Sequence, residues 1–168
     1  MKSAKASRPI ALIGPMGAGK TATAKCLAAL IGWHFIDLDD LVVRKSGKAI
    51  ERIFSEDGEE EFRRLESEAL MSGLAMNTAV IACGGGVVVD RANVELLKSS
   101  ATVVYLKVDI EVAVARVGND SDRPLAPLLE HLVAERDPLY AEAAHFTVEA
   151  GNNVDDVAES VRRAIGIE

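Results

Sequence analysis

Short apolar runs alternate with longer segments of helical periodicity along most of this 168-residue chain. The five runs are Ile10–Ile13, His34–Ile36, Ala79–Cys83, Thr102–Leu106 and His145–Val148. Runs of this length predict buried strands, and the segments between them carry apolar residues at the spacing of helices. Strands that alternate with helices favour a parallel sheet covered on both faces. We therefore predict an α/β fold, a doubly wound three-layer sandwich with a five-stranded parallel sheet that binds ligands at the carboxyl ends of its strands.

The first predicted strand leads directly into the sequence Gly-Pro-Met-Gly-Ala-Gly-Lys-Thr, which covers residues 14–21 and precedes a helical pattern. Glycines allow backbone N–H groups to point inward around a phosphate, and the helix N-terminus adds a positive dipole. The Lys20 ammonium reaches the β- and γ-phosphates in such a loop, and the Thr21 hydroxyl can bind Mg²⁺. The full pattern in this setting favours phosphate binding over a turn that only packs tightly. The predicted nucleotide-binding residues are Gly17, Ala18, Gly19, Lys20, Thr21 and Ala22.

Composition and charge exclude several classes of partner. Lys and Arg total 19 against 26 Asp and Glu, a net charge of −7, so an extended nucleic-acid partner is not expected. The longest apolar stretch is too short and too rich in glycine to span a membrane. Cys26 and Cys83 lie far apart without metal-site spacing, and we expect both to be small buried hydrophobic residues. The length suits one domain, which we expect to be a cytoplasmic monomer with a flexible tail at about 1–8.

The segment 46–76 is long for a single crossover and is predicted to form a substrate-binding flap. It contains two helical stretches joined by the turn signal Asp57-Gly58. In the second stretch Phe62, Leu65, Ala69 and Leu70 form an apolar side. Arg63 and Glu66 stand three residues apart beside it, where they can form an ion pair.

Two carboxylates, Asp37 and Asp39, follow the second predicted strand. Phosphoryl transfer needs one carboxylate to hold Mg²⁺, usually through water, and another to orient or deprotonate the acceptor hydroxyl. The alternative interpretation is that Asp39 or Asp40 simply caps the helix that follows. Their position after a P-loop strand favours a role in chemistry for Asp37 and Asp39.

Further candidates lie in the second half of the chain. The triplet Gly84-Gly85-Gly86 follows the third predicted strand, and it fits either close approach by a ligand or a tight corner. Arg123 lies in a polar loop that is predicted to close as a lid at about 117–127, where an arginine would neutralise a transferred phosphoryl group. Arg116 ends a helical run and could stack on adenine, and Arg136 is a further candidate. Arginines at such positions are often only solvated.

Together these segments resemble the shikimate kinase family, from about Ile10 to Ala164. The resemblance rests on the P-loop sequence, Asp37-Leu38-Asp39, the segment 57–64, the glycine triplet, Arg123-Pro124-Leu125 and the segment 136–140, all in the family's order. It implies a nucleoside-monophosphate-kinase-like member of the P-loop NTPases and transfer of the ATP γ-phosphate to the 3-hydroxyl of shikimate. By analogy, the family's pattern assigns Arg63, Arg136 and Gly84–Gly86 to shikimate, and Asp39 to the ring hydroxyls and the base role. It assigns Thr21 and Asp37 to Mg²⁺, Lys20 and Arg123 to the phosphates of ATP, and Glu66 to an ion pair that holds Arg63.

Two features depart from the family's pattern. Ala82 stands where the family commonly has Ser or Thr, and the chain between Arg123 and Arg136 is shorter than usual. A related kinase acting on gluconate or aminoshikimate fits the P-loop equally well. A nucleotide-binding regulatory protein without transferase activity is the alternative from another class. The chain lacks the guanine-recognition and switch motifs of a GTPase.

Overall fold

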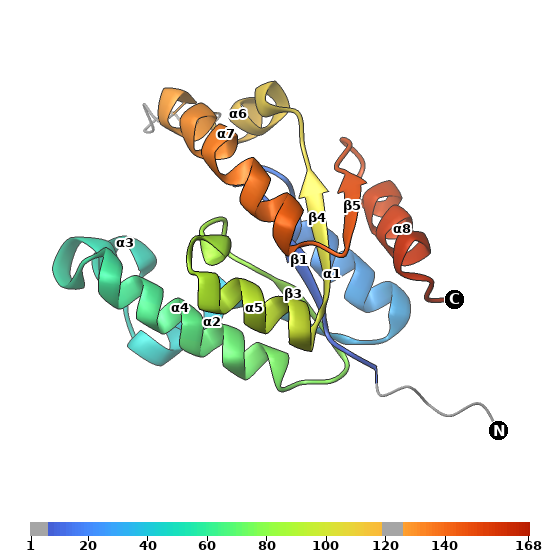
Figure 1. Ribbon diagram of the computed structural model, residues 1–168, viewed down its shortest axis with the longest axis horizontal. Helices are drawn as coiled ribbons and strands as arrows, with labels where there is room; N and C mark the ends of the chain where they lie inside the picture. The colour runs from blue at the N-terminus through green and yellow to red at the C-terminus, as the bar shows by residue number, and fades with distance from the viewer. Residues whose placement is uncertain (1–6, 119–125) are drawn as a thin grey trace.

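The computed structural model describes residues 7–118 and 126–168, which form a five-stranded parallel sheet with helices on both faces (Figure 1). The strands are β1 (Ile10–Ile13), β2 (His34–Asp37), β3 (Ala79–Ala82), β4 (Thr102–Lys107) and β5 (Phe146–Glu149). The α-helices are α1 (Lys20–Ile31), α2 (Leu38–Ser46), α3 (Ile50–Arg52), α4 (Glu59–Leu74), α5 (Arg91–Ser100), α6 (Ile110–Gly118), α7 (Ala126–Ala143) and α8 (Val154–Ile165). A π-helical turn, η1 (Ile53–Asp57), joins α3 to α4, and a 3₁₀ turn, η2 (Val87–Val89), follows β3.

The strand order is β2-β3-β1-β4-β5, with β1 at the centre. In register, Leu12 on β1 pairs with Ala82 on β3 and with Val104 on β4, and Ala82 pairs with Asp37 on β2. Because all strands run in parallel, their carboxyl ends share one edge. Chain order reverses around β1, and a crevice forms at such a point. The P-loop after β1, Asp37 after β2 and the glycines after β3 therefore meet at this edge.

Two hydrophobic clusters hold the three layers together. One lies between the sheet and helices α2, α4, α5 and α7, and includes Leu70, Leu97 and Tyr140. The other lies between the sheet and helices α1, α6 and α8, and includes Leu27 and Val161. Figure 1 shows α2, α4, α5 and α7 on one side of the strands and α1 and α8 on the other. The arrangement confirms the three-layer α/β fold, and the strand bounds differ from the predicted ones by one residue at most.

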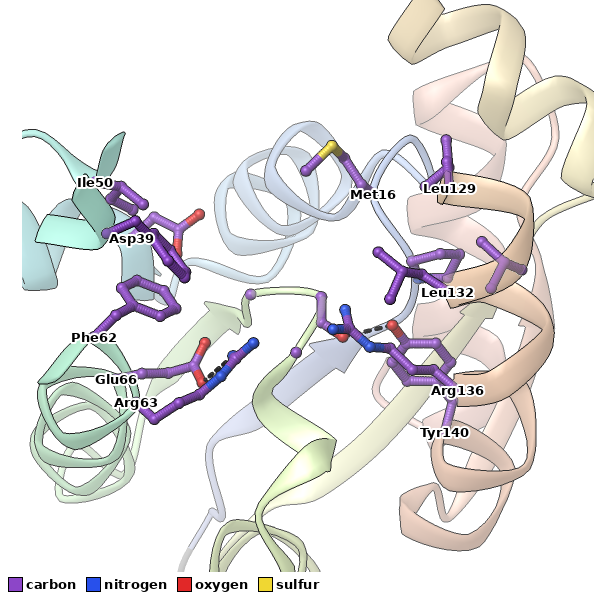
Figure 2. Close-up of a pocket in the computed structure, with 16 residues that line it drawn as sticks. Met16, Asp39, Ile50, Phe62, Arg63, Glu66, Leu129, Leu132, Arg136 and Tyr140 are labelled. Carbon is purple, nitrogen blue, oxygen red and sulfur yellow. Dashed lines mark hydrogen bonds and ion pairs between the residues drawn. The ribbon is translucent and has the colours of Figure 1, made fainter. Parts of the chain in front are cut away.

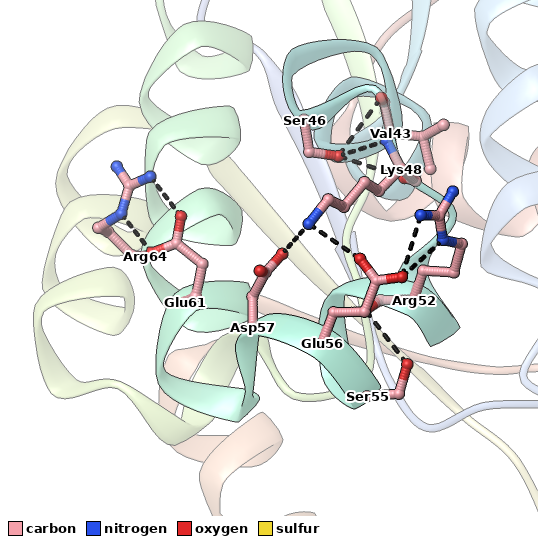
Figure 3. Close-up of polar contacts among 9 residues, drawn as sticks. All are labelled: Val43, Ser46, Lys48, Arg52, Ser55, Glu56, Asp57, Glu61 and Arg64. Atoms are coloured by element: carbon pink, nitrogen blue, oxygen red, sulfur yellow. Dashed lines mark hydrogen bonds and ion pairs between the residues drawn. The ribbon is translucent and has the colours of Figure 1, made fainter.

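The predicted flap folds as two helical pieces, α3 with η1 and then α4, and Gly58 separates them with a φ of 89°. Exposed ion pairs brace the first piece (Figure 3). The Lys48 ammonium lies 2.8 Å from Asp57 and 3.1 Å from Glu56, and Arg52 lies 3.0 Å from Glu56. Pairs of this kind contribute only a few tenths of a kcal/mol each, so the packing of the apolar face of α4 supplies most of the stability. Along the helices within 7–118 and 126–168, none combines the length and the apolar composition that crossing a bilayer requires.

Candidate active site

The P-loop wraps around the N-terminus of α1 and opens into a cavity of about 380 Å³. Gly17 has a φ of 85°, and a Cβ there would lie 2.7 Å from the carbonyl oxygen of Ala113, so only glycine fits. The Lys20 ammonium donates to the carbonyl oxygens of Gly14 at 2.7 Å and Pro15 at 2.8 Å. Burial lowers the pKa of Lys20 to about 8, although the nearby Asp37 and Asp39 partly offset this effect. The lysine is therefore mainly protonated at neutral pH and held in place by the loop itself.

Asp37 serves both the fold and the site. Its Oδ1 accepts hydrogen bonds from the backbone N–H groups of Asp39 at 2.9 Å and Asp40 at 3.4 Å, and so caps α2. Its Oδ2 accepts a hydrogen bond from the Thr21 hydroxyl at 2.8 Å. The alternative interpretation, in which Asp39 or Asp40 caps this helix, does not hold, because β2 continues to Asp37 and the helix begins at Leu38.

Thr21 and Asp37 offer a hydroxyl and a carboxylate side by side at the mouth of the P-loop. Hard oxygen donors of this kind suit Mg²⁺, which keeps several waters and needs few protein ligands. Ala82 pairs with Asp37 across the sheet and adds no oxygen from its side chain. In the part of the chain that the structure describes, no three carboxylate, imidazole or thiol groups gather to hold a metal ion alone. Thr21 and Asp37 are therefore a fitting pair for Mg²⁺ that arrives with phosphates.

A second cavity of about 220 Å³ lies between α4 and α7 and adjoins the first. Asp39, Arg63, Glu66 and Arg136 line it, and Figure 2 shows Arg63 and Arg136 reaching toward each other from the two helices. Apolar side chains form much of the remaining wall, and the glycine triplet and Tyr140 also line it. The apolar side chains are Pro15, Met16, Ile50, Phe54, Phe62, Leu129, Leu132 and Val133. Most of this apolar wall could not be predicted from the sequence, because such residues share the periodicity of the core.

Arg63 and Glu66 form the predicted ion pair, with Nη1 2.9 Å from Oε1. The Glu66 side chain is only 2% exposed, and its Oε2, like Arg63 Nε, has no partner among the described residues. Burial raises the pKa of Glu66, while Arg63 opposes the rise. Burial likewise raises the pKa of Asp39, with a further contribution from Asp37. Within the described residues, no carboxylate lies within ion-pair distance of Arg136. The cavity thus presents unused hydrogen-bonding capacity of both charges to a small polar ligand.

The glycine triplet owes its composition to close neighbours. A Cβ on Gly84 would lie 2.9 Å from Glu66 Oε2 and 3.3 Å from Asp39 Oδ1, and a Cβ on Gly86 would collide with the Arg63 guanidinium. None of the three glycines has a positive φ, so what matters is the missing side chain. Charged side chains of the second cavity therefore lie against the backbone of the glycine triplet. A tight corner alone would not require glycine at these positions.

Two further predicted residues, Arg116 and Ala22, lie beside the P-loop. Arg116 donates to the carbonyl oxygens of Gly17 at 3.0 Å and Gly151 at 2.9 Å, and it lines a further hollow beside Ala18 and Gly19. Ala22 lines the P-loop cavity. Arg123 and most of the predicted lid lie outside the described residues.

The two cysteines differ from each other. Cys83 is buried beside the P-loop cavity as expected, and burial raises its pKa to about 12. The expectation for Cys26 was wrong, because its side chain is partly exposed and its thiol lies 3.2 Å from Asp155 Oδ1. Helix α1 places Cys26 against the N-terminus of α8, where an apolar contact was expected.

The parallel sheet, the P-loop and the second charged cavity define a nucleotide-binding α/β protein equipped for phosphoryl transfer. A family model described as shikimate kinase matches residues 16–166. The chain is 39% identical to a shikimate kinase of Acinetobacter baumannii over 93% of this chain and 91% of the relative. It is 40% identical to a shikimate kinase of Francisella tularensis subsp. novicida over 92% of this chain and 93% of that protein. A solved structure of shikimate kinase from Acinetobacter baumannii in complex with shikimate superposes with a TM-score of 0.89 at 38% identity, covering 95% of this chain and 93% of the other.

The chain belongs to the shikimate kinase family. The resemblance found in the sequence motifs is thereby confirmed, as are the α/β fold and its five-stranded parallel sheet.

Proposed function

We propose that this protein transfers the γ-phosphoryl group of ATP to the 3-hydroxyl of shikimate. One observation carries the proposal: the P-loop cavity and the charged cavity share Met16, Asp39, Gly84 and Gly85 as a common wall. A triphosphate bound in the P-loop cavity would therefore lie beside an acceptor bound in the charged cavity. The family match and the relatives named shikimate kinase support shikimate as acceptor over gluconate, and argue against a protein without transferase activity.

The charges of the second cavity suit a small hydroxylated carboxylate. Arg63 and Arg136 approach from opposite helices, and planar guanidinium groups pair well with a planar carboxylate. Glu66 holds Arg63 by an ion pair and so fixes one of the two groups. Backbone atoms of Gly84–Gly86 would complete the floor of the site. The apolar residues of the wall would contact the carbon ring.

Asp39 is the proposed general base. It lies in the wall between the two cavities, so its carboxylate is within reach of a hydroxyl that faces the phosphate. It would accept the proton as the oxygen attacks phosphorus. Its raised pKa brings the group nearer to neutral pH and makes it a stronger proton acceptor once ionised.

The phosphates are assigned to the P-loop, with Lys20 neutralising charge on the β- and γ-groups and Arg123 proposed to do the same from the lid. Arg116, between the P-loop and Gly151, is assigned to the nucleotide base. Thr21 and Asp37 would hold Mg²⁺, which supplies charge neutralisation on the triphosphate when bound.

An assay of ADP release tests this function. The purified protein is given ATP and Mg²⁺ with shikimate, gluconate, quinate or water alone. We expect fast turnover with shikimate only, and equal rates with all four would refute the proposal.

Substitution of one arginine tests the site separately. Arg63→Ala should raise the KM for shikimate much more than the KM for ATP. Arg64→Ala is the matched control, because Arg64 is the next residue of the same helix and its ion pairs within residues 7–118 and 126–168 are with the partly exposed Glu61 and Glu68. Equal changes in the two variants would remove Arg63 from the acceptor site.

A further inference from the structure

Tyr140 lies one helical turn after Arg136 on α7, and its side chain is almost completely buried, with 1% exposed. Its hydroxyl donates a hydrogen bond of 2.5 Å to the carbonyl oxygen of Gly85 (Figure 2). Burial raises the pKa of Tyr140 to about 12, while the charge of Arg136 works in the opposite direction. The hydroxyl therefore stays protonated and acts as a donor across the physiological pH range.

A second tyrosine makes the role of Tyr140 distinct. Tyr105 on β4 packs against Tyr140 with ring centroids 5.2 Å apart, and its hydroxyl donates to Asp137 on the same helix. Tyr105 thus ties α7 to the sheet. Tyr140, in contrast, ties α7 to the glycine segment after β3. The two rings pack against each other, but their hydroxyls donate hydrogen bonds to different residues.

Gly85 lies between this hydroxyl and the P-loop. A Cβ built on Gly85 would be 3.8 Å from the Tyr140 hydroxyl, 3.6 Å from the backbone nitrogen of Met16 and 3.8 Å from the carbonyl oxygen of Gly14. The next residue, Gly86, lies against the Arg63 guanidinium. The segment is thus in contact with the P-loop on one side and with the charged cavity on the other.

The planar peptide gives the hydrogen bond a directional effect. Because a trans peptide is planar, the direction of the Gly85 carbonyl also fixes the direction of the Gly86 N–H, which points the opposite way. The described residues supply no hydrogen-bond acceptor for the Gly86 N–H. Glycines resist peptide rotation less than other residues do, so this segment needs an external contact to hold one orientation.

We propose that Tyr140 is a positioning residue of the acceptor site, which holds the Gly85–Gly86 peptide in one orientation and at a fixed distance from Arg136. The inference rests on the proposed function, since the acceptor is a small carboxylate gripped in part by Arg136. Tyr140 does not touch the acceptor in this scheme. It acts through the glycine backbone and through the helix that it shares with Arg136.

The test compares Tyr140→Phe with Tyr105→Phe. Tyr140→Phe leaves a buried carbonyl without a partner, and we expect the KM for shikimate to rise about tenfold. The KM for ATP should stay within about twofold and kcat within about threefold of the wild-type values. Tyr105→Phe loses a hydroxyl from the same pair and the same helix contact, and its KM for shikimate should change less than twofold.

The melting temperature of each variant separates positioning from general destabilisation. Similar losses of stability in the two variants, with a raised KM only in Tyr140→Phe, support the inference. Equal KM changes in both variants would overturn it, as would an unchanged KM in Tyr140→Phe. Failure of Tyr140→Phe to fold would also overturn it, because the hydroxyl would then serve the fold. Failure of the wild-type protein to use shikimate would refute the proposed function instead.

Discussion

Substitution of Gly86 by alanine should disable the acceptor site although no ionisable residue is replaced. Gly86 has a φ of −97° and a ψ of 6°, which an L-residue can adopt, so the backbone need not change. The added methyl would lie 2.5 Å from Arg63 Nη2 and 2.7 Å from Arg63 Cζ, whereas real Cβ contacts are essentially never below 3.0 Å. The guanidinium must therefore move away and weaken its 2.9 Å contact with Glu66.

The magnitude follows from the interaction that Arg63 would lose. A hydrogen bond to a charged group contributes about 1.5–3 kcal/mol, and each 1.4 kcal/mol is a factor of ten in binding. We therefore expect the KM for shikimate to rise roughly 10- to 150-fold in Gly86→Ala. The KM for ATP should remain within about twofold, because Gly86 lines the charged cavity and is not among the residues that line the P-loop cavity.

A double-mutant cycle decides whether the methyl acts through Arg63. Steady-state kinetics are measured for Gly86→Ala, Arg63→Ala and the double variant. If the methyl works by displacing Arg63, Gly86→Ala should add little once Arg63 is already alanine. Fully additive effects on the KM for shikimate would refute the reasoning and would mean that the methyl blocks the acceptor directly.

Three further outcomes are expected. Asp39→Asn should lower kcat by about two to four orders of magnitude with nearly unchanged ATP binding, as loss of a general base does, and near-normal turnover would exclude that role. Burial raises the pKa of Glu66 above its ordinary value of 4.5. Above pH 4.5 the folded protein therefore retains a proton that the unfolded chain has lost. The free energy of unfolding of the wild type should fall as pH rises from 4.5 through the raised pKa. Glu66→Gln should therefore gain stability relative to wild type with rising pH in urea titrations, and parallel curves would contradict this. Leu97→Ala removes most of a fully buried side chain that lines neither cavity, and it should cost about 2–5 kcal/mol of unfolding free energy with both KM values unchanged.

Much of the fold could be predicted because local sequence signals agreed with the global arrangement. The apolar runs predicted the strands to within one residue, and the P-loop motif indicated which end of the first strand faces the site. The helix cap at Asp37 was missed because Asp37, Asp39 and Asp40 are all suitable caps, and only the length of β2 decides among them. The residues around the three aspartates do not show which of them caps the helix.

The candidate site was predictable where residues carry chemistry and not where they supply shape. Arg63, Glu66 and Arg136 were identified by charge and motif, and the structure brings them to one cavity. The tie between Tyr140 and Gly85 joins residues 55 positions apart through a backbone atom, which no side-chain pattern reveals. The apolar wall escaped notice because Phe54 and Leu132 look like ordinary helix residues in the sequence.

Oδ1 of Asp37 caps helix α2, whereas its Oδ2 accepts a hydrogen bond from Thr21 at the proposed Mg²⁺ site. Alanine at this position would remove both at once and give an inactive protein whose failure could not be interpreted. Asparagine offers a cleaner dissection, since its amide oxygen can still receive the N–H of Asp39 while the negative charge beside Thr21 disappears. Replacement of one carboxylate oxygen by an amide group would thus separate the helix cap from the proposed binding of Mg²⁺.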